Sequence, residues 1–193
     1  MTDLVLTLIG LDRPGLVESV AQVVADHGGN WLESRMIHLG GHFAGILRVE
    51  VPPDRRGPLS RALEGLGASG LRVVADEAPP ASSPTAPGEA DKARAAPPLG
   101  TRRDDGRLMK LELVGLDRPG LVREISQLLA QHGINVEELS TGRTSAPMSG
   151  EMLFRAEARV KVPAGVEAAR LRARVERLAS DLTVEIKLDE ADG

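Results

Sequence analysis

The order of hydrophobic and polar positions along this chain predicts one set of elements, and the set occurs twice. Residues 4–9 carry leucine at every second position within a mostly apolar run, which is typical of a strand deep inside a sheet. Residues 109–114 show the same alternation, with leucines between charged residues. Each half of the chain is therefore expected to begin with a β-strand.

After each of these strands the apolar spacing changes to three and four residues, which predicts an amphipathic helix. A His-Gly pair then ends the helix, at His27-Gly28 and at His132-Gly133, because glycine is the usual left-handed residue at a helix C-terminus. The apolar positions of the two helices are Leu16, Val20, Val23 and Val24, and Leu121, Ile125, Leu128 and Leu129.

A strand pair, a second helix and a final strand complete each half. The turn of the first strand pair is Gly40-Gly41, whereas the second pair has a longer tip at residues 144–151 that contains Pro147 and Gly150. The remaining expected elements are strands at 30–39 and 43–51, helices at 58–66 and 166–180, and closing strands at 71–75 and 182–188.

The element order βαββαβ, present twice, predicts an α+β fold. Right-handed crossovers convert each copy into a ferredoxin-like module, a four-stranded antiparallel sheet with two helices on one face. We expect domain 1 at residues 1–78 and domain 2 at residues 108–193. Residues 79–107 are dense in Pro, Ala, Ser and Gly and are expected to form a linker, since such a composition does not repay the entropy of ordering.

An eight-residue segment recurs letter for letter: Gly-Leu-Asp-Arg-Pro-Gly-Leu-Val occupies residues 10–17 and residues 115–122. Other matches keep the same spacing of 105 residues, among them Asn30 with Asn135. A spacing this long indicates a duplicated domain, because solenoid repeats are about 20–50 residues long. Most other positions differ, so the shared loop is the first place to look for function.

Composition narrows the classes of function. The chain of 193 residues is 41% hydrophobic but only 2% aromatic, and its net charge is −4. These values argue against direct nucleic acid binding, which relies on basic surfaces and on base stacking. The absence of cysteine excludes disulfides and thiolate metal sites. No apolar run approaches about 20 residues, and the N-terminus lacks a signal-peptide pattern, so we expect a cytoplasmic protein without a membrane span.

The repeated loop suits the start of a helix and the binding of an anion. Asp12 is expected to cap the helix with its carboxylate, and Pro14 suits the first turn, where its missing N–H costs nothing. Gly15 leaves free backbone N–H groups at the helix start, which favour an anion such as a carboxylate. Asn30, at the start of the next strand, can border the same crevice only if a second module docks alongside. A plain helix start needs no ligand, so packing alone is the alternative interpretation.

The succession of strand, Gly-x-Asp-Arg-Pro-Gly-hydrophobic-Val, helix, His-Gly-x-Asn and strand resembles the ACT domain, a small-molecule-sensing module attached to many amino-acid enzymes and regulators. Two such modules without an enzyme, together with Asn-Trp-Leu-Glu-Ser-Arg at residues 30–35, resemble the glycine cleavage system transcriptional repressor family. The likeness covers both expected domains.

The resemblance implies a ligand site where two modules meet. ACT domains usually bind an amino acid with the loop after their first strand, and the asparagine after the first helix is part of the motif. The family implies a non-catalytic regulator that binds an amino acid of the glycine or serine class, with no cofactor and no metal. It also implies a protein partner such as a DNA-binding activator, and a homo-oligomer or an intramolecular pair of modules. The implied site residues are Asp12, Arg13, Pro14, Gly15, Leu16 and Asn30, and Asp117, Arg118, Pro119, Gly120, Leu121 and Asn135.

One departure from the family stays unexplained, and three alternative functions have to be weighed. Serine-sensing ACT domains often carry asparagine where this chain has Asp12 and Asp117, so each aspartate either pairs with a ligand ammonium or only caps a helix. A ligand-free oligomerisation scaffold explains the fold and the duplication equally well. An acylphosphatase needs a phosphate-wrapping loop, for which this one is too short and too constrained by proline. A metal site at His38 and His42, which flank a glycine turn, is the third alternative.

Overall fold

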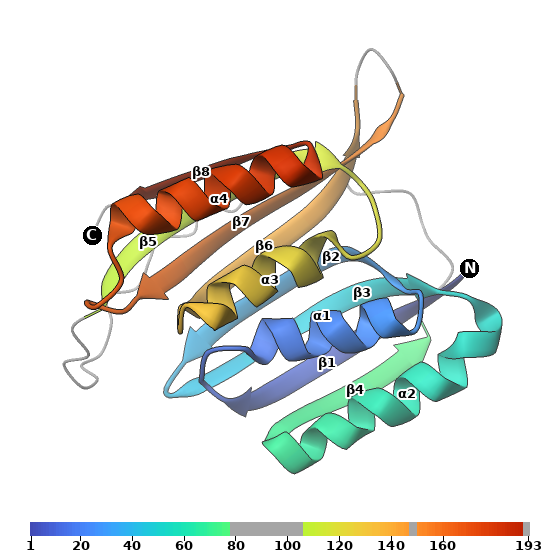
Figure 1. Ribbon diagram of the computed structural model, residues 1–193. Helices are drawn as coiled ribbons and strands as arrows, with labels where there is room; N and C mark the ends of the chain where they lie inside the picture. The colour runs from blue at the N-terminus through green and yellow to red at the C-terminus, as the bar shows by residue number, and fades with distance from the viewer. Residues whose placement is uncertain (78–105, 147–149, 191–193) are drawn as a thin grey trace, which may run out of the picture.

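The computed structural model describes residues 1–77, 106–146 and 150–190 (Figure 1). The expected order βαββαβ is confirmed in both halves. Most of the expected linker, and residues 147–149 of the expected hairpin tip, lie outside the described residues. The first module contains β1 (Thr2–Leu11), α1 (Leu16–Asp26), β2 (Asn30–Leu39), β3 (His42–Val51), α2 (Arg56–Gly65) and β4 (Leu71–Glu77). The second module contains β5 (Arg107–Leu116), α3 (Leu121–Gln131), β6 (Asn135–Ser145), β7 (Met152–Val162), α4 (Ala168–Leu182) and β8 (Val184–Glu190).

Several sequence-based boundaries differ from the structure by one or two residues, and the end of α4 is the case in which a residue changes from strand to helix. A closing strand was expected from Leu182, but α4 includes Leu182 and β8 begins at Val184. Leu178 and Leu182 extend the helical spacing of apolar residues, and both pack against the core. The helix stops at Thr183, whose left-handed backbone has a φ of 55°.

The two modules form one continuous sheet instead of two separate sheets. Its eight strands lie in the order β4-β1-β3-β2-β6-β7-β5-β8. Strands β2 and β6 join the modules in antiparallel register, with Ser34 opposite Thr141 and Met36 opposite Leu139. This is the intramolecular pair of modules that the sequence left open beside a homo-oligomer.

The four helices cover one face of the sheet, and α1 and α3 lie side by side above the junction of the modules (Figure 1). The alternation in β1 explains this layering, because Leu4, Leu6 and Leu8 are all buried in the core. The core is aliphatic apart from Trp31 and two phenylalanines, as the composition predicts. Within the described ranges, no helix is long and apolar enough to cross a membrane.

A small polar cluster is buried where the two modules join. The Trp31 Nε1–H lies 3.3 Å from the Ser34 Oγ and 3.2 Å from the Thr141 Oγ1, and these two hydroxyl oxygens are 2.9 Å apart. A slip of the β2–β6 register would move Thr141 away from Trp31 and Ser34 and break the two hydrogen bonds that cross between the modules, which is costly for buried groups. The cluster therefore favours one register, and that register sets how the loops of each module lie against the other module.

Candidate functional site

The loops that follow β1 and β5 each end in a left-handed glycine. Gly15 has a φ of 90° and Gly120 a φ of 85°, and each directly precedes the first residue of a helix. The left-handed conformation costs other residues about 1–2 kcal/mol, so glycine is strongly favoured at both positions. The first backbone N–H groups of α1 and α3 come directly after these glycines and have no hydrogen-bond partner within their helices. Because glycine has no side chain, the backbone just before these N–H groups carries no Cβ.

The expectation that Asp12 caps the first helix is wrong. Helix α1 begins at Leu16 with Gly15 as its capping residue, and no side chain makes a capping hydrogen bond. Pro14 precedes the cap, so it lies outside the first turn. The backbone N–H of Asp12 instead donates to the Gly41 carbonyl at 3.0 Å, which holds this residue at the end of the β1–β3 ladder. Asp117 is held in the same way, by the Met152 carbonyl at 2.9 Å.

Each aspartate pairs with the asparagine of the other module. The Asn135 Nδ2–H donates to the Asp12 Oδ2 at 2.6 Å, and the Asn30 Nδ2–H donates to Asp117, with N–O distances of 3.2 and 3.4 Å. The loop of one module and the strand start of the other therefore meet, as expected if two modules dock. Within one module, the loop and its own asparagine are not brought together in this way.

The carboxylate of Asp12 lies in an acidic environment. His38 stands between two carboxylates: its Nδ1 is 2.7 Å from the Glu137 Oε2, and its Nε2 is 3.7 Å from the Asp12 Oδ2. Burial raises the pKa of Asp12, and the hydrogen bond from Asn135 and the charge of His38 oppose this rise only in part. The Asp12 Oδ1 is buried and has no hydrogen-bond partner among the described residues.

Asp12, His38 and Glu137 could also hold a metal ion. Each offers one ligand atom, and the three atoms lie within 4.8 Å of one another. Nitrogen and carboxylate oxygen ligands suit several transition metals. The close His38–Glu137 contact and the bond from Asn135 to Asp12 already satisfy much of the cluster without an ion.

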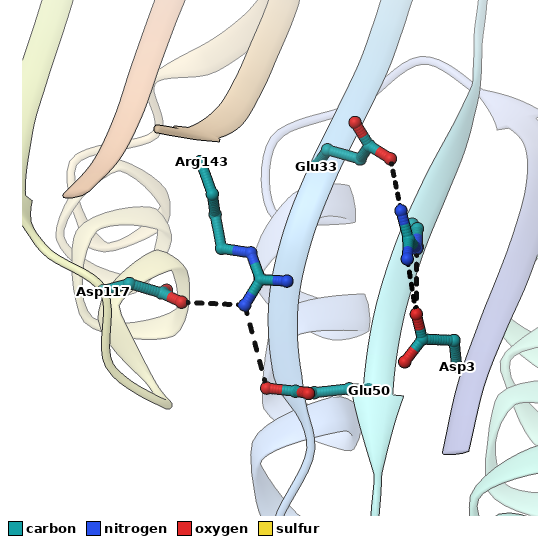
Figure 2. A network of polar contacts seen from close by, with 6 residues as sticks. Asp3, Glu33, Glu50, Asp117 and Arg143 are labelled. Carbon is teal, nitrogen blue, oxygen red and sulfur yellow. Dashed lines mark hydrogen bonds and ion pairs between the residues drawn. The ribbon is translucent and has the colours of Figure 1, made fainter. Parts of the chain in front are cut away.

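The carboxylate of Asp117 lies in a different environment. The Arg143 Nη1 is 3.1 Å from the Asp117 Oδ2 and 3.9 Å from the Glu50 Oε1, so one guanidinium bridges two acidic side chains (Figure 2). Asp117 is only 7% exposed, and its charge is compensated by a permanent cation. A second arginine network, in which Arg48 binds Asp3 and Glu33, lies on the neighbouring strands of the first module (Figure 2).

Two pockets lie between the modules at positions related by the repeat. Each combines the loop and the first helical turn of one module with the first helix and the strand start of the other. Both pockets are shallow and open to solvent, with about 260 to 270 Å³ of space in each when that open solvent is counted. We name them the Gly15 pocket, lined by residues that include Asp12, Gly15, Glu18 and Asn135, and the Gly120 pocket, lined by residues that include Asn30, Trp31, Gly120 and Arg123.

The other predicted site residues have mixed surroundings. Leu16 and Leu121 are buried and belong to the core, while also lining the pockets. The Arg13 Nη2–H donates to the Ser69 carbonyl at 2.8 Å, so this guanidinium is bound to the first module itself. Arg118 is 3.0 Å from the Glu124 Oε2. The prolines restrict the loops that carry these residues.

Three charged residues beside the two aspartates were not among the candidates from the sequence: Arg143, Glu50 and Glu137. His38 was considered only as a metal ligand together with His42. His38 and Arg143 are separated by the repeat spacing of 105, so they are equivalent positions that carry different side chains. That equivalence was visible in the sequence. Their proximity to Asp12 and Asp117 was not, because it depends on how β2 pairs with β6.

Comparison with known proteins identifies both halves. Models described as ACT domain match residues 2–72 and residues 110–174, which together cover most of the chain. No curated protein gives a significant match. An unknown protein from Galdieria sulphuraria has a similar structure, with 27% identity, coverage of 99% of each chain and a TM-score of 0.43.

Two further solved structures show the same kind of similarity. A protein described as a "putative glycine cleavage system transcriptional repressor" is 20% identical, with coverage of 100% of this chain and 98% of the other and a TM-score of 0.40. An ACT domain protein from Streptococcus pneumoniae is 24% identical, with coverage of 44% and 90% and a TM-score of 0.37. The assignment of the family rests on the two model matches.

Proposed function

The chain belongs to the ACT domain family in both of its halves, and from this premise we propose that it is a non-catalytic regulatory protein. It binds a small amino acid of the glycine or serine class between its two modules. It passes this signal to a protein partner, such as a DNA-binding activator, in the control of amino-acid metabolism. A small-ligand regulatory role is what the family suggests. The class of amino acid and the partner come from the sequence resemblance and stay predictions.

The observation that carries the proposal is the contact between each loop and the other module. Asn135 bonds Asp12 and Asn30 bonds Asp117, and a pocket lies beside each pair. A carboxylate at a helix start and an ammonium near an aspartate are the two contacts that an amino acid needs. Both pockets contain a left-handed glycine at a helix start, and acidic side chains, Asp12 and Glu18, line the Gly15 pocket.

Binding between modules provides a route to regulation. A ligand that enters such a pocket contacts the loop of one module and the strand start of the other. It therefore favours one separation of the two modules over others, and a protein can respond to a ligand only through such a difference. The polar cluster of Trp31, Ser34 and Thr141 lies at the same junction, so a change in the separation of the modules would alter its hydrogen bonds.

Isothermal titration of the full chain against the twenty amino acids tests the proposal. We expect saturable binding of one or two of them, and loss of binding in Gly15→Ala or Gly120→Ala, because an added side chain disfavours the left-handed backbone. Gly57→Ala is the matched control, since Gly57 lies in α2 and an added Cβ there meets nothing within 4 Å. Absence of heat from every amino acid would refute the amino-acid sensor.

A ligand-free interaction scaffold is the second candidate function. The asparagine–aspartate pairs favour it, because each aspartate already has a hydrogen-bond partner in the other module without any ligand. In that case all amino acids leave the melting temperature unchanged, whereas a ligand that binds the native state raises it. The two candidates therefore differ in a single thermal measurement.

A further inference from the structure

We infer that only the Gly120 pocket takes the carboxylate group of the ligand, so that the chain binds one small amino acid and not two. This inference rests on the proposed function and concerns the same site. It follows from the charges of the two pockets, which are built alike but carry opposite groups at the position where a carboxylate would bind.

The backbone does not distinguish the pockets. Each has a left-handed glycine, with φ of 90° at Gly15 and 85° at Gly120, followed by an eleven-residue helix. Each helix start therefore presents the same free N–H groups and the same positive end of a helix dipole. Any preference between the two pockets must come from side chains.

The side chain three residues after the glycine differs in charge. It is Glu18 in the Gly15 pocket and Arg123 in the Gly120 pocket, and these positions are separated by the repeat spacing. A Cβ built on Gly15 would lie 3.5 Å from the Glu18 Oε2, so a carboxylate already stands beside this helix start. A Cβ built on Gly120 meets nothing within 4 Å among the described residues. Glu18 therefore repels an anion at the first helix start, whereas Arg123 attracts one at the second.

Arg123 also has an unused donor. Its Nε is buried and has no hydrogen-bond partner in the part of the chain that the structure describes. A buried donor without an acceptor is costly, and a charged donor more so. A ligand carboxylate in the Gly120 pocket would supply the acceptor. The neighbouring Arg118 does not compete for this role to the same degree, because it is 3.0 Å from Glu124.

The opposite wall of the Gly120 pocket provides a selective reporter. Trp31 is the only tryptophan of the chain, and it lines this pocket together with Asn30. At the equivalent position the Gly15 pocket has Val136. Fluorescence of Trp31 therefore reports most directly on the Gly120 pocket, whereas the heat of binding counts ligands in both pockets.

The test combines both readouts on the full chain, with each of the twenty amino acids as probe and with acetate as a carboxylate that lacks an ammonium group. We expect one ligand per chain by titration calorimetry, and a fluorescence change that saturates at the same concentration. Arg123→Gln is expected to weaken binding by roughly 10- to 100-fold, the usual value of a charged hydrogen bond. Arg123→Lys keeps the charge and should retain binding to within several-fold.

Two variants of the Gly15 pocket complete the design. Glu18→Gln should leave the affinity of the first ligand unchanged, and Glu18→Arg should raise the stoichiometry from one to two, with the second ligand seen by heat alone. Circular dichroism checks that each variant is folded. If Arg123→Gln does not fold, the stoichiometry of Glu18→Arg still tests whether the charge at this position decides which pocket binds. Two ligands on the unmodified protein, or a stoichiometry of one in Glu18→Arg, would overturn the inference and leave the proposed function intact. Absence of binding by the unmodified protein would overturn both.

Discussion

Asp12 and Asp117 occupy the same position of the two repeats, yet their replacement by asparagine is expected to change stability in opposite directions. The perturbation is the same in both cases: one negative charge is removed and the shape of the side chain is kept. Asp117→Asn should destabilise the protein at neutral pH, whereas Asp12→Asn should stabilise it. The difference arises from the partners that surround each carboxylate.

The cost of Asp117→Asn follows from its contact with Arg143. The two side chains are 3.1 Å apart, with Asp117 7% exposed and Arg143 27% exposed. A charged hydrogen bond contributes about 1.5–3 kcal/mol, and the partial exposure of the arginine reduces this figure. Glu50, 3.9 Å from the same guanidinium, keeps one partner for it. We expect a loss of about 1–2 kcal/mol, which for a chain of this length lowers the melting temperature by about 2–8 °C.

The gain in stability expected for Asp12→Asn follows from the raised pKa of Asp12. Burial is the main cause of this rise, so the folded protein holds the Asp12 proton more tightly than the unfolded chain does. The ionised form therefore costs stability above the raised pKa, and this cost disappears as the pH falls through it towards the ordinary value of 3.8. The asparagine variant should be more stable than the unmodified protein at pH 7, and its advantage should shrink as the pH approaches about 4.

The measurement is a set of thermal melts, monitored by circular dichroism, on both variants and on the unmodified protein. It is repeated at several pH values between about 4 and 8. Asp12→Asn serves as the matched control for Asp117→Asn, because it makes the same chemical change at the equivalent position. A loss of stability in Asp12→Asn at pH 7, or no loss in Asp117→Asn, would refute the assignment of charges to the two sites.

Three further predictions concern the scaffold. Trp31→Phe removes the indole donor from the buried hydroxyl pair at the module junction and should lower the unfolding free energy by about 1–2 kcal/mol, measured with urea. Thr183→Gly should raise it by about 1 kcal/mol, because Thr183 is left-handed with a φ of 55°. Gly45→Ala should be costly, by about 1–3 kcal/mol, since an added Cβ would lie 2.8 Å from the Met36 Cα on β2. Gly142→Ala on β6 is the control for Gly45→Ala, because its Cβ meets nothing within 4 Å and should leave stability almost unchanged.

Local patterns predicted the modules well, because their elements are set by short-range periodicity. The alternation of leucines in β1 and the three–four spacing in α1 each correspond to an observed element. The cap of α1 was harder to predict. A segment of Asp-Arg-Pro-Gly permits a helix that starts after Asp12 or one that starts after Gly15, and the left-handed backbone of Gly15 selects the second.

Contacts between the modules could not be predicted from either half alone. The pairing of β2 with β6 depends on two strands far apart in the sequence, and their alternation fixes the face of each residue but not the partner strand. His38 and Glu137 are close only because Ile37 lies opposite Glu138 in this ladder. The sequence therefore indicated the loops and asparagines of the site, whereas its charged neighbours required the structure.

The letter-for-letter repeat has a structural reason as well as a functional one. Both loops need a glycine with positive φ, and both aspartates are held by a backbone bond to the neighbouring hairpin and by an asparagine of the other module. These demands apply equally to a module that binds a ligand and to one that does not, so the identity of the loops alone does not establish a sensor. The positions that differ carry more information about function. His38 and Arg143 differ beside the two aspartates, Asp12 and Asp117. Glu18 in the Gly15 pocket and Arg123 in the Gly120 pocket give the two pockets side chains of opposite charge, and charge is what a zwitterionic ligand would distinguish.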